Sequence, residues 1–221
     1  MAEIGLQLYS AWEELARDFH GTLRRIASMG FAQVEYFGGL NRQAAEVRQA
    51  LEAAGLRCPS AHWPMAELVE DFEARLECAR ELRVRYLVCA MPWVRDASQL
   101  RADPAAGPFA MVFQAIAALT LDDWKWNAEQ LNRMGERARK AGIELAYHNH
   151  NFEFRRYEGA AAYDRLLAWT DPELVKMELD CAGRGWRERI RPRISTAIAA
   201  VSGSYTSAIS KPDSRLRRSS G

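Results

Sequence analysis

Short apolar runs alternate with longer amphipathic stretches along the first 180 residues, and the alternation is regular. Short apolar runs bounded by turn residues favour strands, whereas apolar residues that recur with a helical period favour helices. The sequence therefore predicts six strands, at residues 4–10, 32–37, 57–63, 84–91, 143–150 and 175–180.

Five helices are predicted between these strands. The first follows from the spacing of Phe19, Leu23 and Ile26, and in the second Asn41 is the expected N-cap and Gly55 the expected terminator. The third is predicted as one continuous helix over residues 65–82. The fourth starts from a Thr120-x-x-Asp123 cap and stops at Gly142, and the fifth covers residues 160–169. Residues 95–120 form a long connection, which is either a plain insertion or a loop with an extra helix near the site.

A strict alternation of strands and helices implies parallel strands joined by right-handed crossovers. Such strands form either a closed barrel or an open doubly wound sheet. The first strand–helix junction, Tyr9–Trp12, has no glycine-rich phosphate-binding motif, which removes the usual support for the open sheet. The predicted fold class is therefore α/β, a (β/α)8 TIM barrel of which residues 1–180 supply about six βα units.

Polar residues occupy alternate positions on several of the predicted strands. In the fifth strand, Leu145 and Tyr147 alternate with Ala146, His148 and His150. Other strands place polar residues in the same way: Gln7 and Tyr9, Gln33 and Glu35, and Lys176, Glu178 and Asp180. Because helices cover the outside of a barrel, the polar set must point inward, towards the C-terminal strand ends where such barrels carry their sites. Buried carboxylates and imidazoles are costly unless they are paired or bind a cation.

Four motifs fall in the same order as those of one known family. They are Ile4–Ser10 (IGLQLYS), Val34–Gly38 (VEYFG), Ser60–His62 (SAH) and Tyr147–Phe154 (YHNHNFEF), of which the last is the most specific. With them the chain resembles the sugar phosphate isomerase/epimerase family of the xylose-isomerase-like TIM barrels, from its N-terminus to about Asp180. This resemblance implies a sugar or polyol substrate and a divalent metal ion (Mn, Mg, Co or Zn). It implies an isomerase or epimerase that moves a proton next to a carbonyl, with the cation polarising that carbonyl.

The resemblance also suggests roles for individual residues. Asp180 stands where the family places a metal-binding aspartate, and His148 where it usually places a glutamate ligand. Glu153 could supply the missing carboxylate, so the expected metal ligands are His148, Glu153 and Asp180. Glu153 and His62 are the expected catalytic residues. The expected substrate contacts are Tyr9, Glu35, His62 and His150. The alternative is a hydrogen-bonded barrel interior without a metal, in which aromatic residues such as Trp63 only pack.

Residues 181–221 differ in composition from the rest of the chain. They hold nine of the 30 Lys and Arg residues and two of the 29 Asp and Glu residues, so their net charge is +7 and that of residues 1–180 is −6. We predict a disordered or aberrant basic segment here, and the rival interpretation is an appendage that binds RNA or an acidic partner. The family continues with two more βα units that carry a histidine and a glutamate of the site. We therefore expect weak stability, little turnover, and self-association of the open barrel.

Composition and charge add few further constraints. The net charge of +1 gives no general attraction to nucleic acid or membranes, and four scattered cysteines without a CxxC pair indicate reduced thiols. With no secretory signal or apolar span, the expected location is the cytoplasm. Two other functions stay open. One is a non-catalytic sugar-binding or structural remnant of the barrel. The other is an apurinic-site endonuclease, which the four histidines and the acidic body disfavour.

Overall fold

The computed structural model describes residues 4–95 and 108–180. Its centre is a six-stranded parallel sheet of order β1-β2-β3-β4-β5-β8. The strands are β1 Gly5–Gln7, β2 Gln33–Phe37, β3 Arg57–Trp63, β4 Tyr86–Ala90, β5 Glu144–His148 and β8 Val175–Glu178. All six predicted strands therefore form, in sequence order, as an incomplete TIM-type barrel. In the part of the chain that the structure describes, β1 and β8 each pair on one side only. The segment 181–221, for which disorder was expected, lies outside the described residues.

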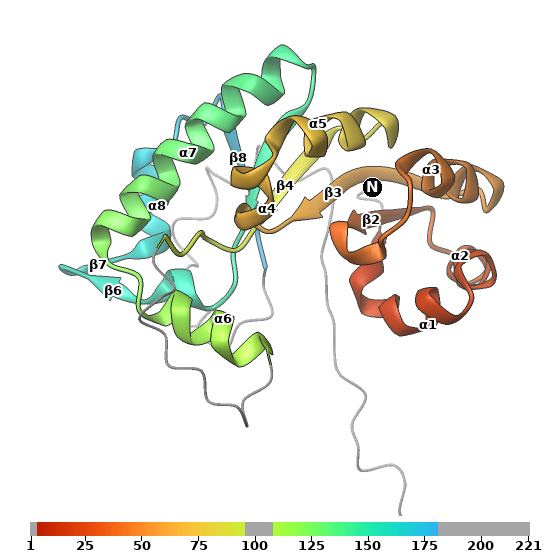
Figure 1. Cartoon of the computed structure of the whole chain (residues 1–221), viewed down its shortest axis with the longest axis horizontal. Helices are drawn as coiled ribbons and strands as arrows, with labels where there is room; N and C mark the ends of the chain where they lie inside the picture. The colour runs from red at the N-terminus through yellow and green to blue at the C-terminus, as the bar shows by residue number, and fades with distance from the viewer. Residues whose placement is uncertain (1–3, 96–107, 181–221) are drawn as a thin grey trace, which may run out of the picture.

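Helices are arranged around the outside of this curved sheet (Figure 1). They are α1 Trp12–Arg17, α2 Phe19–Ser28, α3 Ala44–Ala53, α4 Met65–Glu70, α5 Phe72–Glu81, α6 Pro108–Ala117, α7 Leu121–Lys140 and α8 Ala162–Trp169. Short 3-10 turns η1 Leu8–Ala11, η2 Gly38–Leu40 and η3 Phe152–Phe154 follow β1, β2 and β5. The apolar strand residues pack under the helices; Leu145 and Tyr147 of β5 and Trp124 and Leu131 of α7 are fully or almost fully buried there. No helix among the described residues is long and apolar enough to cross a membrane.

Several predicted element boundaries were wrong, among them the following three. Leu8 does not continue β1 but begins η1. Asn41 does not cap the second helix: it has a left-handed backbone (φ 47°), and α3 begins two residues further on, after Gln43. The predicted helix over 65–82 is divided at Asp71, whose side chain accepts a hydrogen bond from the backbone N–H of Ala74 and so caps α5.

Other local predictions are confirmed. Thr120 and Asp123 form a reciprocal capping box at the start of α7. The long connection contains α6, and the ring of Phe113 in α6 lies 5.2 Å from that of Phe152 in η3. The extra helix therefore contacts the turn after β5. A two-residue hairpin, β6 Arg156–Tyr157 with β7 Ala160–Ala161, was not predicted.

Close packing of α7 against the segment before β8 depends on Gly135. A Cβ atom added there would lie 2.6 Å from the carbonyl oxygen of Leu174 and 2.9 Å from its Cβ. Gly→Ala inside a helix normally stabilises by about 1 kcal/mol. Here we expect Gly135→Ala to destabilise by about 1–3 kcal/mol, because the helix must move away from its neighbour.

Urea denaturation of Gly135→Ala measures this effect. Glu136→Ala is the matched control, because Glu136 is exposed on the same helix and its replacement should change stability by less than about 0.5 kcal/mol. A more stable Gly135→Ala variant would contradict this packing.

Candidate metal and sugar site

Polar residues of five strands meet on the inward face of the curved sheet, because the parallel register places them side by side. Gln7 of β1 is opposite Glu35 of β2, and Glu35 is opposite Ser60 of β3. On the other side of β4, His148 of β5 is opposite Glu178 of β8. Side chains directly opposite one another lie on the same face of a sheet. The sequence alternation therefore places these groups in the interior, as expected.

His62 of β3 and His148 of β5 approach each other across β4. Their ring centroids are 4.8 Å apart, although β4 separates the two strands and contributes Val88 and Ala90 as their register partners. Only a curved sheet with small inward residues on its middle strand permits this approach. The barrel curvature thus creates the site.

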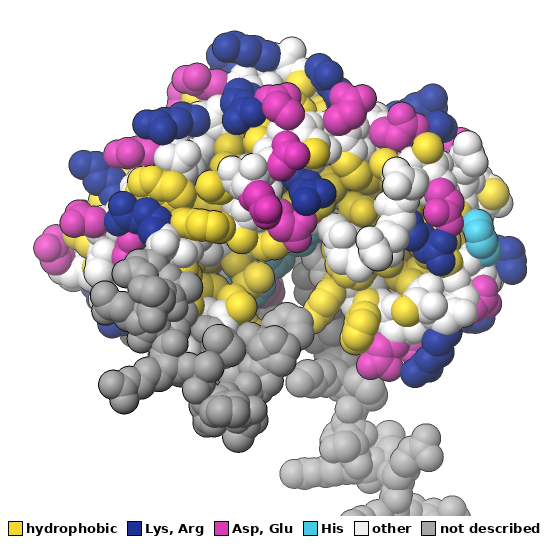
Figure 2. All heavy atoms as spheres, in the orientation of Figure 1, with side chains coloured by type: hydrophobic (Ala, Val, Ile, Leu, Met, Phe, Trp, Pro, Cys, Tyr) yellow, Lys and Arg dark blue, Asp and Glu magenta, His cyan; other side chains and the backbone are white. Residues whose placement is uncertain are grey.

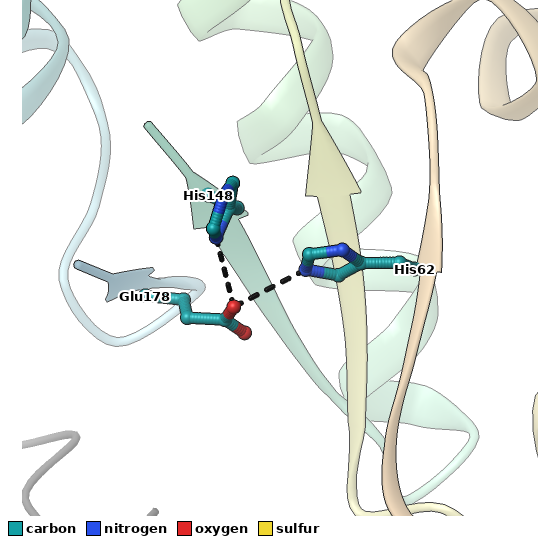
Figure 3. A group of neighbouring side chains, drawn as sticks. All are labelled: His62, His148 and Glu178. Carbon is teal, nitrogen blue, oxygen red and sulfur yellow. Dashed lines mark hydrogen bonds and ion pairs between the residues drawn. The ribbon is translucent and has the colours of Figure 1, made fainter. Parts of the chain in front are cut away.

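The carboxylate of Glu178 lies between these two imidazole rings (Figure 3). His148 Nδ1 donates to Glu178 Oε1 over 2.8 Å, and His62 Nε2 lies 3.2 Å from the same oxygen. All three residues are at most 9 % exposed. Their ligand atoms lie within 4.8 Å of one another, which makes this the group in the described part of the chain that could hold a metal ion.

Glu35 extends this group on the other side of His62. Its Oε1 accepts a hydrogen bond from Gln7 Nε2 (2.9 Å) and lies 3.6 Å from His62 Nε2, and its Oε2 accepts one from Ser60 Oγ (2.5 Å). Gln7 Nε2 is also 2.8 Å from His62 Nδ1. Two carboxylates therefore flank one buried imidazole.

These contacts shift the pKa values in different directions. Burial lowers the pKa of His62, but the charges of Glu35 and Glu178 outweigh it and raise that pKa to about 9. Burial raises the pKa of Glu35, assisted by the charge of Glu178 and opposed by His62. Burial acts in the same direction on Glu178, yet the two histidines hold its pKa well below the usual range. In the absence of a metal, His62 is therefore protonated at neutral pH and Glu178 is ionised.

His150 is the third histidine of the interior. Its ring lies 5.0 Å from that of His148 and 5.9 Å from that of Phe152, and its buried Nδ1 has no hydrogen-bond partner among residues 4–95 and 108–180. Burial and the neighbouring His148 lower the pKa of His150 to about 4, against the opposite effect of Asp180. This imidazole is therefore neutral at neutral pH and can hydrogen-bond a ligand.

The predicted ligands Glu153 and Asp180 lie outside the group formed by His62, His148 and Glu178. Glu153 is fully buried and accepts hydrogen bonds from Tyr147 Oη (2.7 Å) and from the backbone N–H of His150 (2.9 Å). Asp180 lies two residues beyond the end of β8, and its backbone N–H donates to Asn149 Oδ1 (3.1 Å). The structure thus does not bring His148, Glu153 and Asp180 together as one set of ligands; Glu178 and His62 accompany His148 instead.

The aromatic residues near the strand ends differ in their exposure. Tyr9 is 47 % and Trp12 is 53 % exposed, so both can meet a ligand, whereas Trp63 is 1 % exposed and packs against Tyr36. Figure 2 shows a hollow in the molecular surface with hydrophobic side chains on both sides and histidine visible inside it. Trp63 therefore belongs to the core, whereas the side chains of Tyr9 and Trp12 are open to solvent.

Gln7, Ser60 and Glu178 complete the site but are absent from the predicted set. Each has a sequence signal, because each occupies the inward parity of a predicted strand. What the sequence lacks is the register between strands. That register decides that Glu178, rather than Asp180, is opposite His148.

Comparison with known proteins agrees with this architecture. The chain is 30 % identical over 160 residues to an inosose dehydratase of Bacillus licheniformis, covering 72 % of this chain and 51 % of that protein. It is 36 % identical over 69 residues to an inosose dehydratase of Lacticaseibacillus casei, covering 31 % of this chain and 22 % of that one. The chain spans no more than about half of the length of these relatives.

Solved structures give the same result. The crystal structure of a sugar phosphate isomerase/epimerase from Parabacteroides distasonis matches with a TM-score of 0.62 and 27 % identity, over 81 % of this chain and 65 % of that one. A D-psicose 3-epimerase matches in fold with a TM-score of 0.54 and 21 % identity, over 80 % of this chain and 63 % of that one. The model of the xylose isomerase-like TIM barrels matches residues 23–182. The chain therefore belongs to the xylose isomerase-like TIM barrel family.

Proposed function

We propose that this chain carries the metal site of an enzyme that moves a proton at a carbon next to the carbonyl of a keto-sugar or inosose. The observation that supports it is the convergence of His62, His148 and Glu178 within 4.8 Å at the C-terminal strand ends. Isomerases, epimerases and dehydratases of sugars share this first proton abstraction, which accommodates relatives named for each of these activities.

The residues of this group fit a divalent cation. Two imidazoles and one carboxylate form a donor set that suits Mn, Co, Fe or Zn. In addition, His62 Nε2 is buried and lies 3.2 Å from Glu178 Oε1 and 3.6 Å from Glu35 Oε1, so a cation could take the place of the proton that this nitrogen presents to the two carboxylates. A bound cation would polarise the substrate carbonyl and stabilise the negative charge that develops on its oxygen. We assign its binding to His62, His148 and Glu178.

Glu35 is the remaining carboxylate of the interior, and we assign the proton transfer to it. Burial raises its pKa, which makes its carboxylate a stronger base than an exposed one. Gln7 Nε2 and Ser60 Oγ fix its two oxygens in position beside His62. The neutral His150 and the exposed Tyr9 would contact the hydroxyl groups and the carbon face of the substrate.

Solvent-deuterium exchange into a panel of inososes, keto-sugars and their phosphates tests this proposal. With added Mn²⁺ or Co²⁺ we expect deuterium at the carbon next to the carbonyl of one substrate. EDTA and His148→Ala should each abolish the exchange. Sugar binding without metal dependence or exchange would instead indicate a non-catalytic sugar-binding protein.

A further inference from the structure

A carboxylate such as that of Glu153 can bind a metal or act as a base, but both of its oxygens are already hydrogen-bonded within the protein. Its side chain is fully buried, and both oxygens are engaged, Oε1 by Tyr147 Oη and Oε2 by the backbone N–H of His150. Tyr147 alternates with His148 and therefore points away from the inside of the barrel, into the hydrophobic core between the sheet and the helices. Burial raises the pKa of its hydroxyl, and Tyr163 of α8 adds to this effect. The carboxylate of Glu153 is thus held on the helix side of β5.

Burying a carboxylate is costly unless hydrogen bonds compensate for the lost hydration. The two donors of Glu153 come from the residues on either side of the pair His148–Asn149. Glu153 therefore ties the last residue before His148 to the first residue after Asn149. It fixes the direction in which the chain leaves β5.

The same turn is anchored to β8 by Asn149, which is also fully buried. Its amide oxygen accepts from the backbone N–H of Asp180 (3.1 Å), and its amide nitrogen lies 3.4 Å from the Asp180 carbonyl oxygen. Glu153 holds the turn on the helix side and Asn149 holds it on the neighbouring strand. Between these two anchors His148 and His150 have little freedom.

We propose that Glu153 is a positioning residue, which acts from the helix side of β5 to aim the imidazoles of His148 and His150 into the interior. This inference rests on the proposed function in that His148 is taken as a metal ligand. It differs from the expectation drawn from the sequence, in which Glu153 itself binds the metal or moves the proton.

The pair Glu153→Gln and Glu153→Ala separates these two roles. Glutamine can accept a hydrogen bond from the backbone N–H of His150 through its oxygen and donate one to the Tyr147 hydroxyl through its nitrogen, so both hydrogen-bond contacts are kept. We expect Glu153→Gln to bind Mn²⁺ within about threefold of the unchanged chain, and Glu153→Ala to bind it about 10- to 100-fold more weakly, which is typical of a lost positioning partner. Isothermal titration of the full chain measures both.

An equal loss of Mn²⁺ affinity in both variants would overturn the proposal, because a ligand or base does not tolerate an amide. Unchanged affinity in Glu153→Ala would overturn it as well. If Glu153→Ala does not fold, Tyr147→Phe replaces it, because this change removes one of the two hydrogen bonds to Glu153. A loss of Mn²⁺ affinity in Tyr147→Phe smaller than that in Glu153→Gln would contradict the positioning role.

A second measurement does not depend on metal binding. In metal-free, ¹⁵N-histidine-labelled chain, Glu153→Ala should shift the ring signals of His148 and His150, whereas Glu153→Gln should leave them in place. His20, exposed on α2, is the internal control. If the unchanged chain binds no Mn²⁺, the proposed function fails while these signals still test the positioning role; unshifted signals in Glu153→Ala would overturn it.

Discussion

Replacing Glu178 with alanine is expected to lower the free energy of unfolding by about 3–5 kcal/mol, the range for removal of one partner from a buried ion pair. Its Oε1 is 2.8 Å from His148 Nδ1 and 3.2 Å from His62 Nε2, and the residue is only 9 % exposed. The alanine variant leaves two adjacent imidazoles in the interior without the carboxylate that they share. The same change should abolish Mn²⁺ binding.

Urea denaturation at pH 6 in EDTA isolates this effect from any metal. Glu178→Gln is the matched variant: it keeps the size and an oxygen acceptor for His148 but loses the charge, so its loss should be smaller. Glu144→Ala serves as the surface control, because its ion pair with Arg85 (2.8 Å) is exposed and is expected to contribute less than about 1 kcal/mol. A Glu178→Ala variant as stable as Glu144→Ala would contradict the buried pairing.

Raising the pH from 6.5 to 9 is expected to reduce the stability of the metal-free chain by up to about 3 kcal/mol. His62 has a pKa of about 9 in the folded chain against an ordinary value of 6.5. A raised pKa means that folding favours the protonated form, so this contribution is complete below pH 6.5 and disappears as the pH rises through 9. Each pKa unit corresponds to about 1.4 kcal/mol.

Two other groups limit stability on the acid side. The lowered pKa of Glu178 gives a contribution that is present above pH 4.5 and is lost below it. The lowered pKa of His150 makes its protonation unfavourable in the folded chain, so stability also declines below pH 6.5. The maximum is therefore expected near pH 6.5.

Urea denaturation at half-unit steps between pH 5 and 9.5, in EDTA, measures this profile. Protonation of His62 at Nδ1 also requires the Gln7 amide to turn its oxygen towards the ring, which makes 3 kcal/mol an upper value. His62→Asn should flatten the decline in stability between pH 6.5 and 9. His20→Asn should leave this decline unchanged, because His20 is exposed on α2. A decline that persists in His62→Asn would assign it to other groups.

Much of the fold follows from the sequence because the governing signals are local. Apolar periodicity placed all six strands, and the capping box at Thr120 placed the start of the longest helix. The wrong boundaries have a local explanation as well. Asn and Asp are both favourable N-cap residues. Asn41 nevertheless adopts a left-handed backbone after η2, and Asp71 interrupts a helix whose apolar spacing continues through it.

The site is less predictable because it depends on register between strands. Parity correctly placed Glu35 and His148 in the interior, since alternation along a strand is fixed. Which of Glu178 and Asp180 reaches His148 depends on how β8 aligns with β5, which no local pattern encodes. The side of the sheet on which Glu153 lies depends on the path of a turn, and turns have no such alternation.

The contact between Gly135 and Leu174 gives α7 a further role, because it fixes the position at which β8 starts. Leu174 is pressed against the helix, and Glu178 follows four positions later, opposite His148. One extra residue between Leu174 and Glu178 would turn Met177 towards the inside of the barrel and Glu178 into the hydrophobic core between the sheet and the helices. Length changes in the loop before β8 are therefore harmless only ahead of Leu174.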